Sequence, residues 1–393
     1  MRNTLRLIFL LPMLLFFVGN AYSEDKRRVS LLTCSPGEQV YELFGHTALR
    51  FVDPSRGVDV VFNYGLFSFS EPNFVWRFVL GKTDYILGAT DYNYFILEYA
   101  ERGSGVTEQV LALDSLQKSE IIEALVKNSL PQNRTYRYNF LFNNCTTKAR
   151  DKIVEAVRGK IEYNTPSIGD SLTFRQIVHQ YTAGYPWYQF GMDMLLGAPA
   201  DVVAHRSGAQ FAPCVLMQEF VDATVVDEEG CRGVVAEQNE LLLPQVRESE
   251  TNNLTPFNVS LLLLLFTFVV MLCERRNKIN FWLWDIFIML LQGASGAVLL
   301  FMVLFSQHPA VDCNWLLIWL NPLPLVLLPI LIYRLKKGLS MTFMWIEVLM
   351  PALFILLSPL LPQCFPASLY ICAVAVIIRS LFHIYKKNIC ALD

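Results

Sequence analysis

The chain has 393 residues, and 53% of them are hydrophobic. Its mean hydropathy of +0.36 is too high for a chain that is soluble along its whole length, so part of it is expected in a membrane. The formal net charge of −3 and the isoelectric point near 6.0 leave no basic excess, which excludes a nucleic-acid partner on electrostatic grounds.

Residues 1–23 have the features of a secretory signal peptide. Arg2 and Arg6 supply two positive charges, residues 7–18 are nearly all apolar, and small residues precede a cleavage site near Ser23. The alternative is a retained anchor helix, although the apolar run is short for a membrane span. Under both interpretations the polypeptide that follows is exported.

Residues 24–245 mix polar and apolar side chains and are predicted to form the exported domain, and a polar linker at 246–256 separates them from an apolar C-terminal part. Strand-like and helix-like patterns both occur in the exported part, so we expect an α+β domain. The expected strands cover residues 29–33, 46–52, 58–64 and 106–113, and the expected helices cover 115–128 and the segment from 145 to Gly159. In an oxidising compartment Cys214 and Cys231, which flank a short polar loop, could form a disulfide.

The C-terminal part, residues 257–393, contains five apolar stretches that are long enough, or nearly so, to cross a hydrocarbon core of ~30 Å. They cover about 257–273, 281–305, 315–333, 342–361 and 366–385. Lys and Arg occur in the alternate connections and after the fifth stretch, but not in the connections 306–314 and 358–366. By the positive-inside rule this all-α domain crosses an inner membrane five times, with the N-terminal domain in the periplasm and the C-terminus in the cytoplasm.

The connection 306–314 would lie on the same side of the membrane as the exported domain. His308 and Asp312 in this loop are therefore candidates for contacting the polar head group of a substrate, and the alternative is that they belong to an ordinary solvated turn. Charged residues are nearly absent inside the five stretches, which argues against a transporter. Asp285, near the start of the second stretch, is expected to reach the membrane surface by snorkelling.

Cys145 lies at the predicted N-terminus of a helix whose apolar residues repeat at helical spacing through Ala149 and Ile153. Unpaired backbone N–H groups and the positive end of the helix dipole favour a thiolate at this position. The backbone amides of Cys145 and of a neighbour such as Asn144 could then form an oxyanion hole. The alternative is a buried structural cysteine, with Asn144 as a helix cap.

His46 lies on a strand-like segment that a turn at residues 53–57 joins to the next strand. Antiparallel pairing around this turn places His46 opposite Asn63 or Tyr64, so Asn63 could orient the imidazole and Tyr64 could support the site. Together with Cys145 these residues would form a Cys-His-Asn nucleophile site. The alternative is that His46 is a packed histidine without a chemical role.

Other chemistries have weaker support. Cys34 precedes a Pro-Gly turn rather than a helix, so it ranks second as a nucleophilic thiol. The sequence has no G-x-S-x-G nucleophile elbow, and its histidines and cysteines are not grouped as a zinc site requires. We therefore expect a reaction that uses no metal or cofactor.

Several short motifs resemble those of the Lnb N-terminal periplasmic domain family, a group of Gram-negative envelope proteins often followed by membrane spans. These motifs are residues 33–37, 44–50, 63–65, 138–140 and 143–145. More broadly, the order of strand His, second-strand polar residue and Asn-Cys helix start resembles circularly permuted NlpC-like and papain-like thiol enzymes, which include lecithin:retinol acyltransferase. The resemblance implies a permuted papain-like fold, in which an antiparallel sheet packs on a catalytic helix, with Cys145 as nucleophile, His46 as base and Asn63 as orienting residue.

Members of this superfamily cleave peptidoglycan peptides, or transfer and hydrolyse acyl groups on lipids. Asn63 departs from their common pattern, in which a second His is frequent. We expect a membrane-anchored periplasmic cysteine hydrolase or acyltransferase that acts on an amide or ester of an envelope lipid, lipoprotein or peptidoglycan peptide, through an acyl-enzyme on Cys145. The alternative is a non-catalytic envelope module that binds a ligand or partner protein and is tethered by its spans. The sequence predicts no particular oligomeric state.

Overall fold

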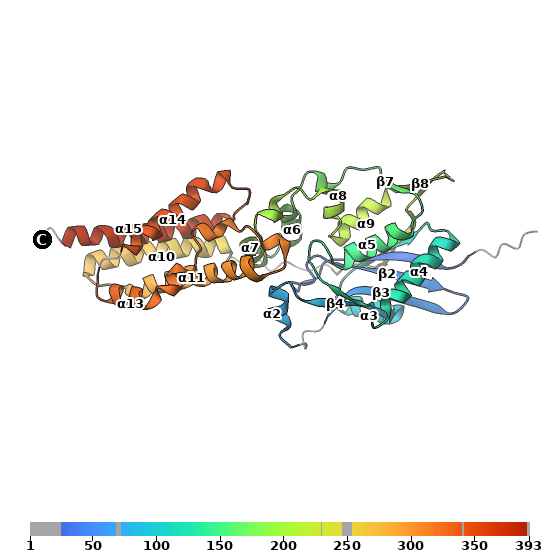
Figure 1. Ribbon diagram of the computed structural model, residues 1–393, viewed down its shortest axis with the longest axis horizontal. Helices are drawn as coiled ribbons and strands as arrows, with labels where there is room; N and C mark the ends of the chain where they lie inside the picture. Colours follow the sequence, from blue (N-terminus) through green and yellow to red (C-terminus); the bar gives the residue numbers. More distant parts are fainter. Residues whose placement is uncertain (1–24, 68–71, 229, 246–253, 340–341, 391–393) are drawn as a thin grey trace, which may run out of the picture.

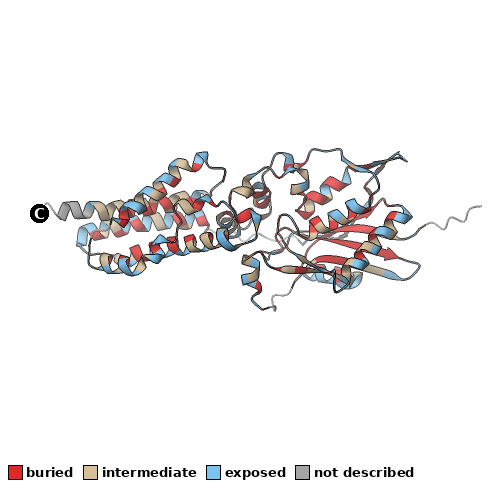
Figure 2. Cartoon of the chain, viewed as in Figure 1, coloured by how far each residue is buried: buried red, intermediate tan, exposed pale blue. Residues whose placement is uncertain are grey.

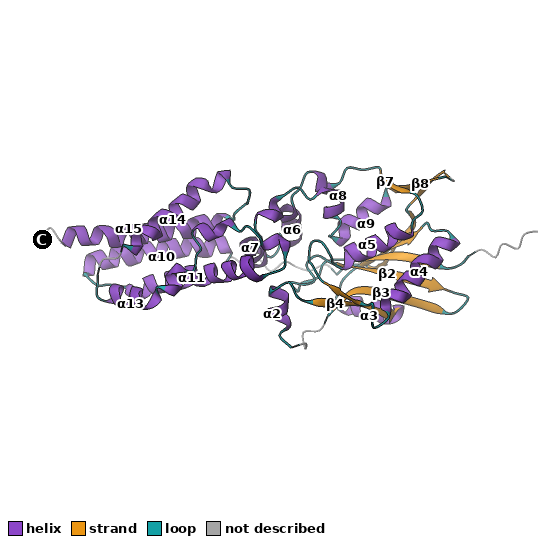
Figure 3. Ribbon diagram, in the orientation of Figure 1, coloured by secondary structure: helices purple, strands orange, loops and turns teal. Residues whose placement is uncertain are grey.

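The computed structural model describes residues 25–67, 72–228, 230–245, 254–339 and 342–390, with side chains to residue 385. The predicted signal peptide and most of the predicted linker lie outside the described residues. The molecule is elongated, with a domain built on a β-sheet at one end and a bundle of long helices at the other (Figure 1, Figure 3).

Seven strands form an antiparallel sheet in the order β10-β5-β1-β2-β3-β4-β6. Their bounds are β1 (Arg28–Cys34), β2 (His46–Asp53), β3 (Val58–Leu66), β4 (Asp84–Asp91), β5 (Val106–Leu111), β6 (Thr135–Arg137) and β10 (Val235–Leu242). The four predicted strands correspond to β1, β2, β3 and β5. A second, three-stranded sheet consists of β7 (Lys160–Tyr163), β8 (Ala223–Asp227) and β9 (Gly230–Gly233).

Helices cover both faces of the main sheet, because neighbouring side chains of a strand point to opposite faces. Leu31 of β1 packs with α4 (Ser115–Ser129) and α5 (Cys145–Ala156), whereas Leu32 packs with α3 (Tyr92–Glu101). The buried side chains therefore concentrate on the strands between these two helical layers (Figure 2). The prediction of an α+β domain is confirmed, and α4 and α5 are the two predicted helices.

The segment between α5 and β10 consists mainly of short helices. They are η1 (Ile168–Asp170), α6 (Phe174–Thr182), α7 (Pro186–Leu195), η2 (Ala198–Asp201), α8 (His205–Ala209) and α9 (Pro213–Val221). Cys214 lies in α9 and interacts with Tyr181, whereas Cys231 lies in β9 opposite Val226. Both are free thiols, so the structure does not contain the predicted disulfide. The reason is that the two cysteines lie on different elements and contact different residues.

The C-terminal part is helical, and among the described residues four helices are long and apolar enough to cross a membrane. These are α10 (Pro256–Asn277), α11 (Trp282–Phe305), α14 (Phe343–Leu357) with its continuation η5 (Ser358–Leu360), and α15 (Ala367–Cys390). The third predicted stretch, 315–333, does not form one continuous helix. Pro322, Pro324 and Pro329 interrupt it, because proline lacks the backbone N–H that an internal helical turn requires. The pieces are η4 (Trp315–Ile318), α12 (Leu323–Val326) and α13 (Leu328–Lys336).

Charged side chains are buried where α10, α11 and α15 meet. Arg379 donates to Glu274 at 2.8 Å and to Asp285 at 2.8 Å, and His383 lies 3.0 Å from Asp285. Asp285 is only 2% exposed, so the expectation that it snorkels to the surface is wrong. Charged residues are few in the predicted stretches, and Asp285 and Arg379 are paired with each other inside the bundle rather than exposed.

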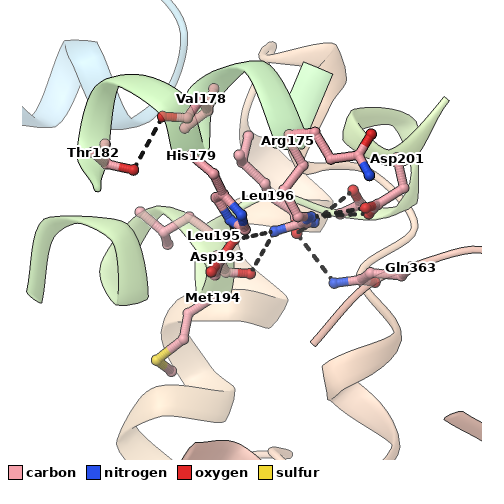
Figure 4. Close-up of polar contacts among 12 residues, drawn as sticks. Arg175, Val178, His179, Thr182, Asp193, Met194, Leu195, Leu196, Asp201 and Gln363 are labelled. Carbon is pink, nitrogen blue, oxygen red and sulfur yellow. Dashed lines mark hydrogen bonds and ion pairs between the residues drawn. The ribbon is translucent and has the colours of Figure 1, made fainter. Parts of the chain in front are cut away.

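A hydrogen-bonded junction holds the sheet domain against the bundle. Arg175 of α6 is 1% exposed, and it donates to Asp193 of α7 at 2.9 Å and to Asp201 of η2 at 3.0 Å. The carbonyl oxygen of Leu196 accepts a hydrogen bond from Arg175 at 2.8 Å (Figure 4). It accepts a second one, at 3.1 Å, from Gln363 in the connection before α15. The α6–α7 segment is therefore a fixed link between the two parts of the molecule.

Candidate active site

Cys145 is the first residue of α5, and Asn144 is the N-cap that makes the helix begin there. The Asn144 side-chain oxygen accepts from the backbone N–H groups of Thr146 and Thr147, both at 2.9 Å. The backbone N–H of Asn144 donates in turn to the Thr147 hydroxyl at 2.9 Å. This N–H is therefore occupied, and the alternative in which Asn144 acts as a helix cap describes it better than the predicted role in an oxyanion hole.

The side-chain amide of Asn144 also anchors the segment before the helix. It donates to the carbonyl oxygens of Phe140 and Phe211, both at 2.9 Å. Asn144 is 5% exposed, so these bonds are shielded from water. Asn144 supports the site by fixing the position of the residue that follows it, Cys145.

His46 is the first residue of β2, and its Nε2 atom lies 2.6 Å from the side-chain oxygen of Asn63 on β3. Leu49 of β2 pairs with Phe62 of β3. Extending this register by three residues places His46 opposite Gly65 rather than opposite Asn63 or Tyr64. The predicted register was wrong by one or two residues, but the predicted contact with Asn63 forms diagonally on the same face of the sheet.

Gly65 brings the thiol and the imidazole together. A Cβ atom at this position would lie 3.6 Å from Cβ of Cys145 and 3.7 Å from Cε1 of His46, so both side chains border the same small space. Gly65 has a φ of 94°, in the left-handed region that side chains other than that of glycine rarely adopt. The irregular pairing of β3 after Asn63 therefore opens the end of the sheet to the first turn of α5.

The electrostatics favour an ionised pair. Burial alone would raise the pKa of the Cys145 thiol, but the nearby His46, the backbone N–H of Thr47 and the hydroxyl of Thr146 outweigh it and lower the pKa to about 7. Burial alone would lower the pKa of His46, yet Cys145 and Asn63 raise it overall. Because the Asn63 oxygen accepts from Nε2, the other ring nitrogen, Nδ1, remains for proton exchange with the thiol.

Two threonines complete this arrangement, and neither was predicted from the sequence. Thr47 and Thr146 lie with their hydroxyl oxygens 3.1 Å apart, and the Thr146 hydroxyl lies 3.8 Å from the sulfur of Cys145. Each threonine directly follows a predicted site residue, His46 or Cys145. That adjacency is the sequence signal that could have identified them.

Tyr136 on β6 is a further site residue that was not predicted from the sequence. Its hydroxyl is buried and has no hydrogen-bond partner in the described part of the chain. It lies 3.9 Å from the position that a Cβ of Gly65 would occupy, which is also beside Cys145. Burial, and then the neighbouring Cys145, raise the pKa of Tyr136, so the phenol remains a proton donor.

Tyr64 does not have the predicted supporting role at the thiol. Its hydroxyl donates to the side-chain oxygen of Asn128 on α4 at 2.8 Å, and its ring lies in the core beneath α4 and α5. Adjacent strand residues face opposite sides of a sheet, so Tyr64 points away from the face that Asn63 shares with His46. Its link to the site is indirect, through an edge contact with the ring of Tyr136 at 6.0 Å.

Cys34, the second candidate thiol, pairs with His46 in the register of β1 and β2. It is 0% exposed, and burial raises its pKa far above the ordinary value. A thiol that stays protonated is a poor nucleophile. Cys145 is therefore the better candidate of the two.

His308 and Asp312 take part in the junction between the two parts of the molecule. His308 donates from Nε2 to the carbonyl oxygen of Phe78 at 2.8 Å and packs on the ring of that residue. The backbone of Asp312 abuts Gly197, beside the Arg175 cluster. The predicted contact with a substrate therefore has no support from their positions.

Among the described residues, no group of three His, Cys, Asp or Glu side chains is placed to hold a metal ion.

The comparisons with known proteins agree with this division of the chain. Residues 18–180 match the Lnb N-terminal periplasmic domain, and residues 247–388 match the Lnb transmembrane domain. The chain belongs to the Lnb family, as a multi-pass membrane protein whose N-terminal domain is periplasmic. No curated protein and no solved structure matches the chain.

Proposed function

We propose that the protein is a membrane-anchored periplasmic cysteine hydrolase or acyltransferase that acts on an amide or ester of an envelope component. The observation that carries this proposal is the arrangement of Cys145 and His46 around Gly65, with Asn63 holding the far side of the imidazole at 2.6 Å. A thiol with a pKa of about 7, next to a histidine that can exchange a proton with it, is an activated nucleophile.

In the proposed reaction the thiolate of Cys145 attacks the substrate carbonyl carbon and forms a tetrahedral intermediate. The imidazolium of His46 gives its Nδ1 proton to the leaving oxygen or nitrogen, and a thioester remains on the sulfur. Water, or a hydroxyl or amine acceptor, then attacks the thioester while His46 removes its proton. Release of the acyl product restores the thiol and the neutral imidazole.

The oxyanion of the tetrahedral intermediate needs hydrogen-bond donors that are already in place. We assign this role to the backbone N–H of Cys145, at the positive end of α5, and to the hydroxyl of Tyr136. The unsatisfied hydroxyl of Tyr136 supports the assignment, because a buried donor without a partner costs free energy unless a ligand uses it.

We also propose that the domain is a circularly permuted papain-like domain. His46 and Asn63 lie on β2 and β3, before Cys145 on α5, whereas in papain the cysteine comes first in the chain. The thiol helix packs on an antiparallel sheet in the manner that this relationship requires. The same arrangement underlies the proposed kinship with lecithin:retinol acyltransferase.

We further propose that the interrupted segment is a fifth span in an inner membrane, which places the C-terminus in the cytoplasm. At one end, the backbone N–H of Trp315 donates to the side-chain oxygen of Gln363 at 2.8 Å, and Gln363 donates in turn to Leu196 beside the sheet domain. At the other end, the carbonyl of Leu335 accepts from Asn280 in the connection between α10 and α11, beyond the opposite ends of both helices. The segment thus runs the length of the bundle, and an enzyme fixed in this way favours an envelope lipid or lipoprotein over distant peptidoglycan.

Mass analysis of the purified full-length protein tests the function. After incubation with envelope lipids, lipoproteins or peptidoglycan fragments, an acyl adduct should appear on Cys145 and should be absent from the Cys145→Ser and His46→Ala variants. Cys231→Ser is the matched control, because it removes an exposed thiol elsewhere in the same domain.

Two outcomes would contradict the proposal. One is the absence of any adduct from all three substrate classes. The other is an adduct that forms at an unchanged rate in the His46→Ala variant. Either result would favour the rival interpretation, a non-catalytic binding module tethered by its spans.

A further inference from the structure

Helix α2 (Phe74–Val79) exposes apolar side chains beside the membrane helices. Val75 is 69% exposed, Trp76 is 54% exposed and Phe78 is 38% exposed. In Figure 1 the helix lies at the junction between the sheet domain and the bundle. Large exposed apolar side chains grouped on one short element indicate a surface that binds something apolar.

Four contacts fix α2 against the periplasmic end of α11. The ring of Trp76 packs on Phe301 at 4.9 Å, and the hydroxyl of Ser306 donates to the carbonyl oxygen of Val79 at 2.8 Å. The two elements are further joined by the hydrogen bond from His308 to Phe78 and by one from the Gln307 N–H to Leu80, both at the C-terminal end of α2. The helix is thus attached to a membrane span and not free to swing away.

The contact with Phe301 sets the depth of α2. Phe301 precedes Phe305, the last residue of α11, by one helical turn, which is about 6 Å along the axis. Trp76 therefore lies below the end of the span, at the level where hydrocarbon meets head groups. Tryptophan is the residue most typical of that level, because its ring is apolar and its N–H is polar.

The neighbouring surfaces agree with this position. On α11 itself Val298, Leu304 and Phe305 are 53%, 62% and 58% exposed, as expected for side chains that face lipid. Lys82, three residues after the last residue of α2, is exposed, and a lysine at a membrane surface is attracted to lipid phosphate groups. The apolar face of α2 is continuous with the lipid-facing surface of a span, and a cation borders it on the side of the domain.

We propose that α2 is an interfacial membrane-binding element whose partner is the phospholipid of the periplasmic leaflet, with Val75, Trp76 and Phe78 inserted between head groups and acyl chains. The element would add a direct contact between the sheet domain and the bilayer to the contact that the Arg175 junction makes with the bundle. The proposal does not depend on any reaction at Cys145.

A stack of aromatic rings links this element to the thiol. Phe74 of α2 lies 5.3 Å from Phe67, Phe67 lies 4.9 Å from Tyr85, and Tyr85 lies 4.1 Å from Tyr138. Burial raises the pKa of both tyrosines; Cys145 raises the pKa of Tyr85 further, and Tyr85 and then Cys145 raise that of Tyr138. Tyr85 pairs with Tyr136 in the register of β4 and β6, so the stack runs from α2 to the strand that carries Tyr136 beside the thiol.

Photo-crosslinking in the full-length protein tests the proposal. A benzoyl-phenylalanine residue replaces Val75 on α2 in one variant, and in the control it replaces Val126, which is 52% exposed on α4, a helix of the sheet domain that lies away from the bundle in Figure 1. Both proteins are placed in nanodiscs of phosphatidylethanolamine and phosphatidylglycerol and irradiated. We expect phospholipid adducts at position 75 and none at position 126.

Equal lipid yields at the two positions, or crosslinks from position 75 to protein alone, would overturn the proposal. Trp76→Phe gives an independent measurement, because phenylalanine keeps the ring contact with Phe301. Replacement should remove a component of tryptophan fluorescence that brominated phospholipids quench, and unchanged quenching would also overturn the proposal. The same lipid adducts should form in a Cys145→Ser background, so failure here is distinguishable from failure of the proposed enzymatic function.

Discussion

The hydroxyl groups of Thr47 and Thr146 meet at 3.1 Å between the sheet and the helix that covers it. Thr47 follows His46 at the start of β2, and Thr146 follows Cys145 at the start of α5. Both threonines are 0% exposed. The contact therefore fixes the separation of the two elements whose first residues carry the imidazole and the thiol.

The pH dependence of alkylation should reveal the influence of His46 on Cys145. The thiolate is the reactive form, so in the wild type the rate should fall as the pH drops below about 7. In His46→Ala the burial remains but the neighbouring charge is lost, so the pKa should reach or exceed its ordinary value of about 8.5. At pH 7 the variant should then react about 15-fold more slowly or worse. Peptide mass analysis after timed iodoacetamide treatment measures this, with exposed Cys231 as the internal control.

Tyr136→Phe should separate catalysis from folding. The substitution removes a buried hydroxyl that has no partner in the described structure, so the free energy of unfolding should be unchanged or slightly higher. If this hydroxyl stabilises the oxyanion, formation of the acyl adduct on Cys145 should slow by about 100-fold or more. Acylation kinetics and thermal unfolding of the same preparation provide both values. A normal acylation rate would remove Tyr136 from the proposed mechanism.

Loss of the Asn144 cap should lower both stability and thiol reactivity. Replacement by alanine removes the two bonds to the start of α5, at a cost of about 1 kcal/mol, and leaves two buried carbonyl groups without their donor. Asp114→Ala is the matched control, because Asp114 forms the same kind of capping box at the start of α4. Both variants should unfold at a lower temperature, whereas only Asn144→Ala should slow the alkylation of Cys145.

The junction at Arg175 should be a major source of stability. Arg175→Met would leave Asp201 buried without its counter-charge and Asp193 with only its 2.7 Å contact to His179, at a cost of about 3–5 kcal/mol. Arg158→Met is the control, because the pair of Arg158 with Glu120 is exposed and should contribute about 1 kcal/mol or less. Thermal unfolding of the two full-length variants in detergent measures the difference. Similar melting temperatures would contradict the role assigned to Arg175.

The part of the candidate site that could be predicted from sequence depends on local patterns. Helical spacing from Cys145 and the turn before Val58 located α5 and the β2–β3 hairpin, which bring Cys145, His46 and Asn63 together. The register was less predictable, because Asp53 pairs with Val58 and the turn is one residue shorter than expected. The predicted contact of Asn63 with His46 still forms, because diagonal neighbours on one face of a sheet can also touch.

The remainder depends on contacts between distant segments, which leave no local signal. Tyr136 lies on a strand of three residues, too short to show an alternating pattern, and reaches the thiol only through the pairing of β4 and β6. The pairing of Arg379 with Asp285 joins residues 94 positions apart. The interruption of the stretch 315–333, by contrast, could have been predicted, because its prolines are present in the sequence. The hydropathy pattern by itself does not show that they break the helix.

The cluster of Arg379 with Glu274 and Asp285 has a consequence for biogenesis. The two acids belong to the first helices of the bundle, whereas the guanidinium group that neutralises them belongs to the last one. During translation, α10 and α11 leave the ribosome with uncompensated carboxylates, which are costly in hydrocarbon. A truncated polypeptide that lacks α15 should therefore be poorly retained in the bilayer and cleared by membrane proteases.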